Sequence, residues 1–132
     1  MAKSSLAEKL RIQSGQRVLI MNAPLGYMDE LGELPEAVEV AHQPDGPFDF
    51  VHLFVKNVAE LESLGPAALG AVKYDGLLWV SYPKRSSKVE TDIARDVGWD
   101  VMAGAGLRPV TQVSINDVWS ALRFRPADRV GQ

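Results

Sequence analysis

The sequence predicts an α/β fold, in which helices cover both faces of a mostly parallel, doubly wound sheet of about six strands. Short apolar segments alternate along the chain with segments of helical pattern. The segment 48–55 is apolar at nearly every position, as is typical of a strand covered on both faces. The last two apolar segments meet at Asn116–Asp117, which predicts a C-terminal antiparallel hairpin at one edge of the sheet.

The predicted strands are short apolar segments rich in β-branched residues and bounded by turn-forming residues. They span 17–21, 38–41, 48–55, 77–82, 110–115 and 118–125. A Pro-Asp-Gly-Pro turn at 44–47 precedes the third of them. Asp75–Gly76 predicts a turn into the fourth, and Pro83 ends it.

Three helix N-termini are marked by a Ser or Asn that precedes a Glu by three positions, the spacing of a capping box. The pairs are Ser5 with Glu8, Asn57 with Glu60, and Ser87 with Glu90. The second of these helices should be kinked or interrupted at Gly65–Pro66. The third is predicted to continue to about Gly104, because valine or isoleucine recurs every four residues from 89 to 101. A shorter helix is expected at 27–34.

Composition sets limits on the class of protein. The 132 residues, 46% hydrophobic and 23% charged, predict a single globular domain over 1–132. The sequence has no Cys and two His, which excludes thiolate chemistry and a three-histidine metal site, and we expect no metal. A net charge of −3 argues against nucleic acid as a partner. With no apolar run long enough to span a membrane, we expect a cytoplasmic protein without membrane contact.

Four passages together resemble the class I S-adenosylmethionine-dependent methyltransferases. They are 10–19 (LRIQSGQRVL), 48–51 (FDFV), 72–80 (VKYDGLLWV) and 103–107 (AGAGL) with the hairpin that follows. In order, they are similar to the lead-in to the family's first strand, its fourth strand, the turn into its fifth, and its last helix. The resemblance implies a Rossmann-like, methyltransferase-like fold.

The departures from that family fall where it holds its cofactor. Its first strand runs into a Gly-rich loop, whereas 22–26 here reads Asn-Ala-Pro-Leu-Gly. The family's second strand usually ends in an acid that binds ribose hydroxyls, whereas 40–43 reads Val-Ala-His-Gln. One strand–helix unit of that family is also missing before Phe48. The comparison therefore implies that no cofactor is bound in the family's usual way.

A closer resemblance is to a small bacterial family classed only as a domain of unknown function. The passages that carry it are 18–24 (VLIMNAP), 49–55 (DFVHLFV), 79–84 (WVSYPK) and 117–122 (DVWSAL). This likeness supports the same fold and implies a bacterial origin. It implies no activity.

Candidate functional residues follow the predicted strands, since ligands of open parallel sheets bind beyond the carboxyl ends of the strands. Asn22, Pro24 and Lys84 lie there, and Ser86 and Ser87 follow just before the predicted third helix. Cations, hydroxyls and a helix N-terminus would form an anion site. The alternative is a solvated basic loop in which Ser87 only caps the helix.

His52 is unusual because its ionisable ring lies inside an apolar strand. With Asn22 and Lys84 it is a candidate for catalysis, as a general base or a ligand contact. The alternative is a neutral core histidine with one or two hydrogen bonds.

Charge and aromatic residues are unevenly placed. Residues 28–62 contain nine acids and one base, a sum of −8, which leaves +5 for the rest of the chain. Such asymmetry either steers a partner or a second copy of the chain, or reflects solvated surfaces. Trp119, Arg123 and Arg125 alternate onto one face of the last strand, either as an interface or packed under a helix.

Three hypotheses follow for the function. The first is a non-catalytic, methyltransferase-like scaffold that has lost its cofactor site and binds an unknown protein partner or small ligand. A homo-oligomer is compatible with it. The second is an enzyme or small-anion-binding protein that uses Asn22, His52 and Lys84. The third is an unusual methyltransferase completed by a partner subunit that supplies the missing glycine loop.

Overall fold

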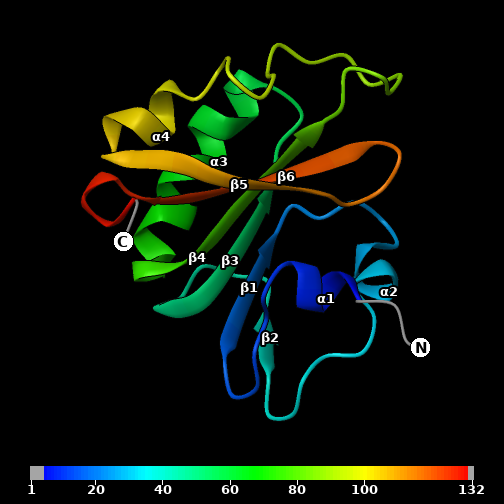
Figure 1. The fold of residues 1–132 in the computed structure, drawn as a ribbon, viewed down its shortest axis with the longest axis vertical. Helices are drawn as coiled ribbons and strands as arrows, with labels where there is room; N and C mark the ends of the chain where they lie inside the picture. The colour runs from blue at the N-terminus through cyan, green and yellow to red at the C-terminus, as the bar shows by residue number, and fades with distance from the viewer. Residues whose placement is uncertain (1–4, 131–132) are drawn as a thin grey trace.

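The computed structural model describes residues 5–130 and contains one six-stranded sheet in the order β2-β1-β3-β4-β6-β5 (Figure 1). The strands are β1 (Arg17–Met21), β2 (Glu39–Ala41), β3 (Phe48–Phe54), β4 (Val72–Pro83), β5 (Leu107–Ser114) and β6 (Trp119–Pro126). Strands β2, β1, β3 and β4 are parallel to one another, and β6 is antiparallel to both β4 and β5. The predicted α/β fold, with a mostly parallel sheet and a C-terminal hairpin, is confirmed.

The helices are α1 (Leu6–Lys9), α2 (Tyr27–Leu31), α3 (Val58–Ala71) and α4 (Asp100–Gly104), with a 3₁₀ turn, η1, at Ala127–Arg129. Two predicted caps are confirmed: the Ser5 hydroxyl accepts the Glu8 amide at 3.1 Å, and the Asn57 side chain accepts the Glu60 amide at 2.8 Å. Helix α3 continues through Pro66 without interruption. Its buried residues, among them Leu61 and Ala68, hold it against the sheet on both sides of the proline.

The sheet separates two apolar cores. On one face, Leu61 and Ala68 of α3 and Met102 of α4 form a core with the sheet side chains that project to that face. On the other face, α1 and α2 pack onto residues such as Phe54 and Trp79. Alternate residues of β3 enter opposite cores, which is why this strand is apolar at almost every position.

The helix predicted from Ser87 to Gly104 is wrong. Residues 84–99 form an irregular connection, and only α4 at its end is helical. The Trp99 indole N–H donates to the Ala94 and Arg95 carbonyls at 2.8 and 3.0 Å, so a side chain uses acceptors that a helix would need. Gly98 has a φ of 96°, which excludes a helix there. Val97 remains 59% exposed, so burial does not favour a helix either.

The predicted turn at Asp75–Gly76 lies inside a strand. Strand β4 begins at Val72, and its pairing with β3 shifts register between Phe48 and Phe50, opposite this dipeptide. Asp75 has a φ of 55°, a conformation that Asp tolerates better than most residues. The dipeptide is therefore a bulge, and it directs the Asp75 carboxylate toward Arg125 of β6 at 2.8 and 2.9 Å.

Among residues 5–130, no helix is both long and apolar enough to cross a membrane.

Candidate functional site

The carboxyl ends of β1 and β3 lie side by side, and the chain leaves them for helices on opposite faces of the sheet. Asn22 follows β1 with a φ of 59°. Its side-chain amide donates to the Phe54 carbonyl at 2.9 Å and to the Glu60 carboxylate at 3.1 Å. The same carboxylate accepts the Lys56 amide at 2.7 Å. Both amide hydrogens of Asn22 therefore tie β1 to β3 and to the first turn of α3.

His52 lies two residues before the end of β3 and is fully buried. Its Nδ1 lies 2.7 Å from the Tyr27 hydroxyl and its Nε2 lies 2.6 Å from the Ser81 hydroxyl. The ring stacks on Phe54 at 4.2 Å between centroids. Burial lowers the pKa of His52 to about 3, and burial also raises the pKa of Tyr27. His52 is thus a neutral core histidine whose two nitrogens are already engaged, which leaves no free nitrogen to act as a base on an external substrate.

Lys84 and the two serines do not meet a helix N-terminus, because the predicted third helix is absent. The Lys84 ammonium donates to the Ser114 hydroxyl of β5 at 2.6 Å. The Ser87 hydroxyl donates to the Lys84 carbonyl at 2.8 Å and accepts the Val89 amide at 3.3 Å, so it shapes the loop. Ser86 is exposed. The geometry on which the predicted anion site depended is not formed.

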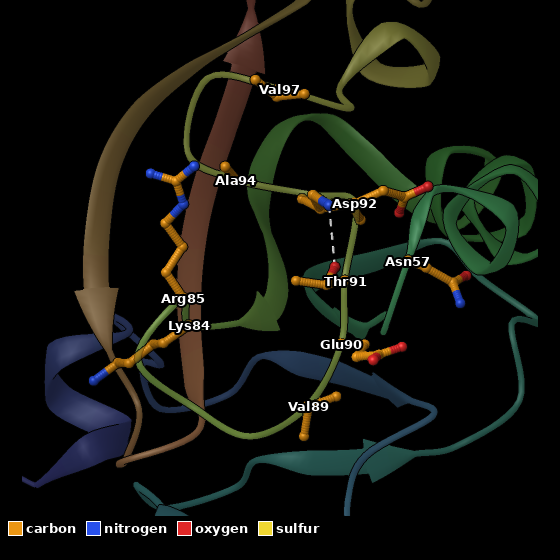
Figure 2. Close-up of a pocket in the computed structure, with 10 residues that line it drawn as sticks. Asn57, Lys84, Arg85, Val89, Glu90, Thr91, Asp92, Ala94 and Val97 are labelled. Carbon is orange, nitrogen blue, oxygen red and sulfur yellow. Dashed lines mark hydrogen bonds between the residues drawn. The ribbon is translucent and has the colours of Figure 1, made fainter.

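The irregular connection, residues 84–99, borders an open cavity of about 830 Å³ (Figure 2). Lys84 and Arg85 lie on one side of it, and Glu90, Asp92 and Asn57 on the other. The Asp92 carboxylate accepts the Val58 amide at 2.8 Å. Asn57 also caps α3, so the protein's own side chains already occupy donors of this helix terminus. The cavity therefore has walls of mixed charge.

A second cavity, of about 480 Å³, lies beyond the carboxyl ends of β1 and β2. It is lined by Asn22, Pro24, Leu25, Met28 and Asp29 among others, and by His42. The His42 Nδ1 lies 3.2 Å from the Ile20 carbonyl of β1. Leu25 is fully exposed at the rim, and Met28 is partly exposed.

The structure thus separates the predicted site residues. Asn22 and Pro24 line the cavity beside β1, Lys84 lines the cavity at 84–97, and Ser86, Ser87 and His52 line neither. Asp92 and His42 were not predicted as site residues. Nothing local marks Asp92, because it reaches α3 from a distant loop. His42 could have been found from its place after β2. Residues 5–130 contain no group of three or more His, Asp or Glu arranged to hold a metal ion.

Solved structures similar to this chain include methyltransferases. The ribosomal protein L11 methylase from Lactobacillus delbrueckii subsp. bulgaricus has a TM-score of 0.58 and 11% identity, covering 92% of this chain and 74% of that one. DhpI in complex with SAH has a TM-score of 0.60 and 15% identity, covering 90% and 81%. The N-methyltransferase NodS from Bradyrhizobium japonicum WM9 has a TM-score of 0.57 and 11% identity, covering 91% and 92%.

No protein-family profile matches the sequence, and no curated protein is detectably similar to it in sequence. At such low identities the structural likeness establishes the fold alone, which is a Rossmann-like methyltransferase fold.

Proposed function

We propose that this chain is a non-catalytic, methyltransferase-like scaffold that has lost the S-adenosylmethionine site and binds a protein partner at the same end of the sheet. The observation that carries the proposal is Asn22. In the family that the sequence resembles, glycines let a cofactor approach the backbone after the first strand. Here the Asn22 side chain spans that point and bonds to Phe54 and Glu60. Pro24, two residues on, offers no backbone N–H.

The end of β2 supports the same proposal. The resemblance implies an acid there that would accept hydrogen bonds from ribose hydroxyls. His42 stands near this position instead, and its Nδ1 lies against the Ile20 carbonyl. Because the Ile20 carbonyl can only accept, the His42 Nδ1 donates this hydrogen bond and is not free for a ligand. The replacement of both family features, the glycines by Asn22 and Pro24 and the acid by His42, supports the proposed loss of the cofactor site.

Isothermal titration with S-adenosylmethionine tests the loss of the cofactor site. We expect no saturable heat up to a ligand concentration of about 1 mM, which corresponds to a binding free energy weaker than about −4.1 kcal/mol. A thermal unfolding scan of the same sample shows that the protein is folded. Saturable binding with a micromolar Kd would overturn this part of the proposal.

The surface beside this point supports a protein as the partner. Leu25 is fully exposed beside the partly exposed Met28, and both line the cavity at the ends of β1 and β2. Asp29 also lines it, within the segment 28–62, whose formal charge is −8. Exposed apolar side chains beside acidic ones fit a partner segment that carries both apolar and basic side chains. We place such a scaffold in the bacterial cytoplasm.

Substitution of Leu25 tests the partner surface. The tagged chain is isolated from its source cells, and bound proteins are quantified by mass spectrometry. We expect Leu25→Ser to lower the yield of a stoichiometric partner at least about tenfold, which corresponds to about 1.4 kcal/mol. Val97→Ser, at an exposed valine beside the other cavity, is the control and should retain the partner. Equal retention by both variants, or no stoichiometric partner of the wild type, contradicts the proposal.

The alternative, an enzyme or small-anion-binding protein that uses Asn22, His52 and Lys84, requires these side chains to converge. Instead, Asn22 bonds to Phe54 and Glu60. His52 bonds to Tyr27 and Ser81, and Lys84 bonds to Ser114. No observation among the described residues favours this function over the scaffold.

A further inference from the structure

A third cavity lies at the beginning of β4, at the opposite end of the sheet from the two cavities described above. Its volume is about 390 Å³. It is bordered by the last turn of α3, the first residues of β4 and β5, and the end of β6. Small-molecule sites in proteins have volumes of roughly 300–1,000 Å³, so this cavity has room for a small molecule.

The inner surface of this cavity is apolar. Leu78 of β4 and Phe124 of β6 are directly opposed in the sheet and form its floor. Leu69, Val72 and Leu107 are only partly buried and form its walls. All five side chains belong to or pack against the core between the sheet, α3 and α4. The cavity is therefore a recess in the edge of this core, and an apolar ligand would be stabilised there by leaving water.

The charged side chains that line the cavity already have partners. The Lys73 ammonium donates to the Asp49 carboxylate at 2.7 Å. The Asp75 carboxylate accepts hydrogen bonds from Arg125 at 2.8 and 2.9 Å and from Arg129 at 3.3 Å. These charges are balanced within the protein, so an ionised ligand would have to compete with the existing ion pairs. An uncharged ligand would leave them intact.

Tyr74 places an aromatic ring at the edge of the cavity. Its side chain is 69% exposed, and its hydroxyl donates to the Asp128 carboxylate at 2.6 Å. This hydrogen bond holds the ring beside the apolar walls, although contact of the ring with water is unfavourable. A flat ring bound in the cavity would pack against it in an offset-stacked or edge-to-face arrangement.

We propose that this cavity binds a small, uncharged aromatic compound with two fused rings. An apolar cavity of about 150 Å³ holds one benzene ring, and this cavity has more than twice that volume. A fatty acid is disfavoured, because its carboxylate would compete with Asp49 or Asp75 for their cations. The inference does not depend on the scaffold proposal, because the two sites lie at opposite ends of the sheet.

Nuclear magnetic resonance of methyl groups tests the site, with indole as the probe. The protein is labelled with ¹³C at the leucine and valine methyl groups. We expect saturable shifts of the Leu69, Val72 and Leu107 signals, with a Kd below about 1 mM. The signals of Leu25 and Val97, which line the other two cavities, should not shift. Shifts that stay linear up to about 5 mM indole, or equal shifts at all these side chains, would overturn the proposal.

Two alanines near the end of α4 provide matched variants. Ala105 is exposed and lines the cavity, so Ala105→Trp should fill the mouth and weaken indole binding at least about tenfold. Ala103 is also exposed but lies outside the cavity, and Ala103→Trp should bind indole as the wild type does. Tyr74→Ala should weaken binding about threefold, since it removes the ring at the edge. Unchanged affinity in both Ala105→Trp and Tyr74→Ala contradicts the site.

Matched ligands test the chemistry of the compound. Indole-3-acetamide and indole-3-acetate have nearly the same size and differ in charge, and the amide should bind at least about tenfold more tightly. Equal affinities, or tighter binding of the acetate, would show that the ligand is not uncharged. N-acetyltryptophanamide presents the same ring as a protein segment does. Tighter binding of this compound than of indole would mean that the cavity takes a side chain of a partner protein, and the small-molecule proposal would fail.

Discussion

Replacement of Trp79 by alanine should lower the free energy of unfolding by about 3–5 kcal/mol. The side chain is completely buried and belongs to the core between the sheet and α1. Its indole N–H donates to the Leu10 carbonyl at 3.0 Å, across 69 positions of sequence. The alanine variant therefore loses apolar contact area and leaves a buried carbonyl without its donor. Urea denaturation at pH 7, followed by circular dichroism, measures the difference.

Two further variants separate the causes. Trp79→Phe retains most of the ring but not the indole N–H, and we expect a loss of about 1–3 kcal/mol. Tyr74→Ala removes an aromatic side chain that is 69% exposed, and should cost less than about 1 kcal/mol despite its hydrogen bond to Asp128. A cost below about 1 kcal/mol for Trp79→Ala would contradict the burial of this side chain.

The sequence predicts the strands well because their signal is local. The segment 17–21 has the bounds of β1, and 48–55 exceeds β3 by one residue. A strand that is buried on both faces of the sheet has an almost continuous run of apolar residues, and such a run is rare in loops. The caps at Ser5 and Asn57 are local for the same reason, since the donor lies three residues from the acceptor.

The segment 87–104 could not be predicted from local pattern. The spacing of Val89, Ile93, Val97 and Val101 is that of a helix, but β-branched residues contribute little helix propensity. The deciding contacts are those of Trp99 with two carbonyls and those of Gly98 with Val58 of α3. A Cβ atom at position 98 would lie 3.0 Å from the Val58 side chain. The approach of Gly98 to Val58 depends on where α3 is packed, and the valine and isoleucine spacing carries no information about that.

The sequence predicts where the candidate site residues lie in the fold, but not which partners their side chains contact. Asn22 and Lys84 do follow the strands named from the sequence. Whether two such side chains converge depends on partners from other elements: Phe54 and Glu60 take the first, and Ser114 takes the second. The positions of strands along the chain follow from hydrophobic pattern, whereas the partner of a long polar side chain follows from the three-dimensional arrangement.

Acidification should destabilise the protein through His52. Burial lowers the pKa of His52 from 6.5 to about 3 in the folded state, while the unfolded chain keeps the ordinary value. Between these pH values the unfolded state binds the extra proton, so the stability from neutral His52 is complete above about pH 6.5 and decreases toward pH 3. The expected slope is about 1.4 kcal/mol per pH unit, or about 2–3 kcal/mol between pH 6.5 and 4.5.

Carboxylates act in a lower range of pH. Arg125 lowers the pKa of the Asp75 carboxyl to about 2, and Lys73 lowers the pKa of Asp49. The contributions of these two carboxylates to the free energy of unfolding are therefore lost only below about pH 4. The interval from pH 6.5 to 4.5 therefore isolates the histidine. His52→Gln should be less stable at pH 7 and should show a flatter profile in this interval. His42→Gln, which leaves the core unchanged, is the control and should retain the wild-type slope.

The ring signals of His52 give a second measurement that does not depend on any variant folding. Neutral imidazole donates from one nitrogen and accepts at the other, which matches a pair of hydroxyl partners, Tyr27 and Ser81. Protonation would place two donors in the core and leave one hydroxyl to reverse its role. In nuclear magnetic resonance, the His52 signals should remain those of a neutral ring down to about pH 4.5, while the folded state persists. Titration of this ring near pH 6.5 would show that it is not sealed in the core, and the predicted acid sensitivity would then have another origin.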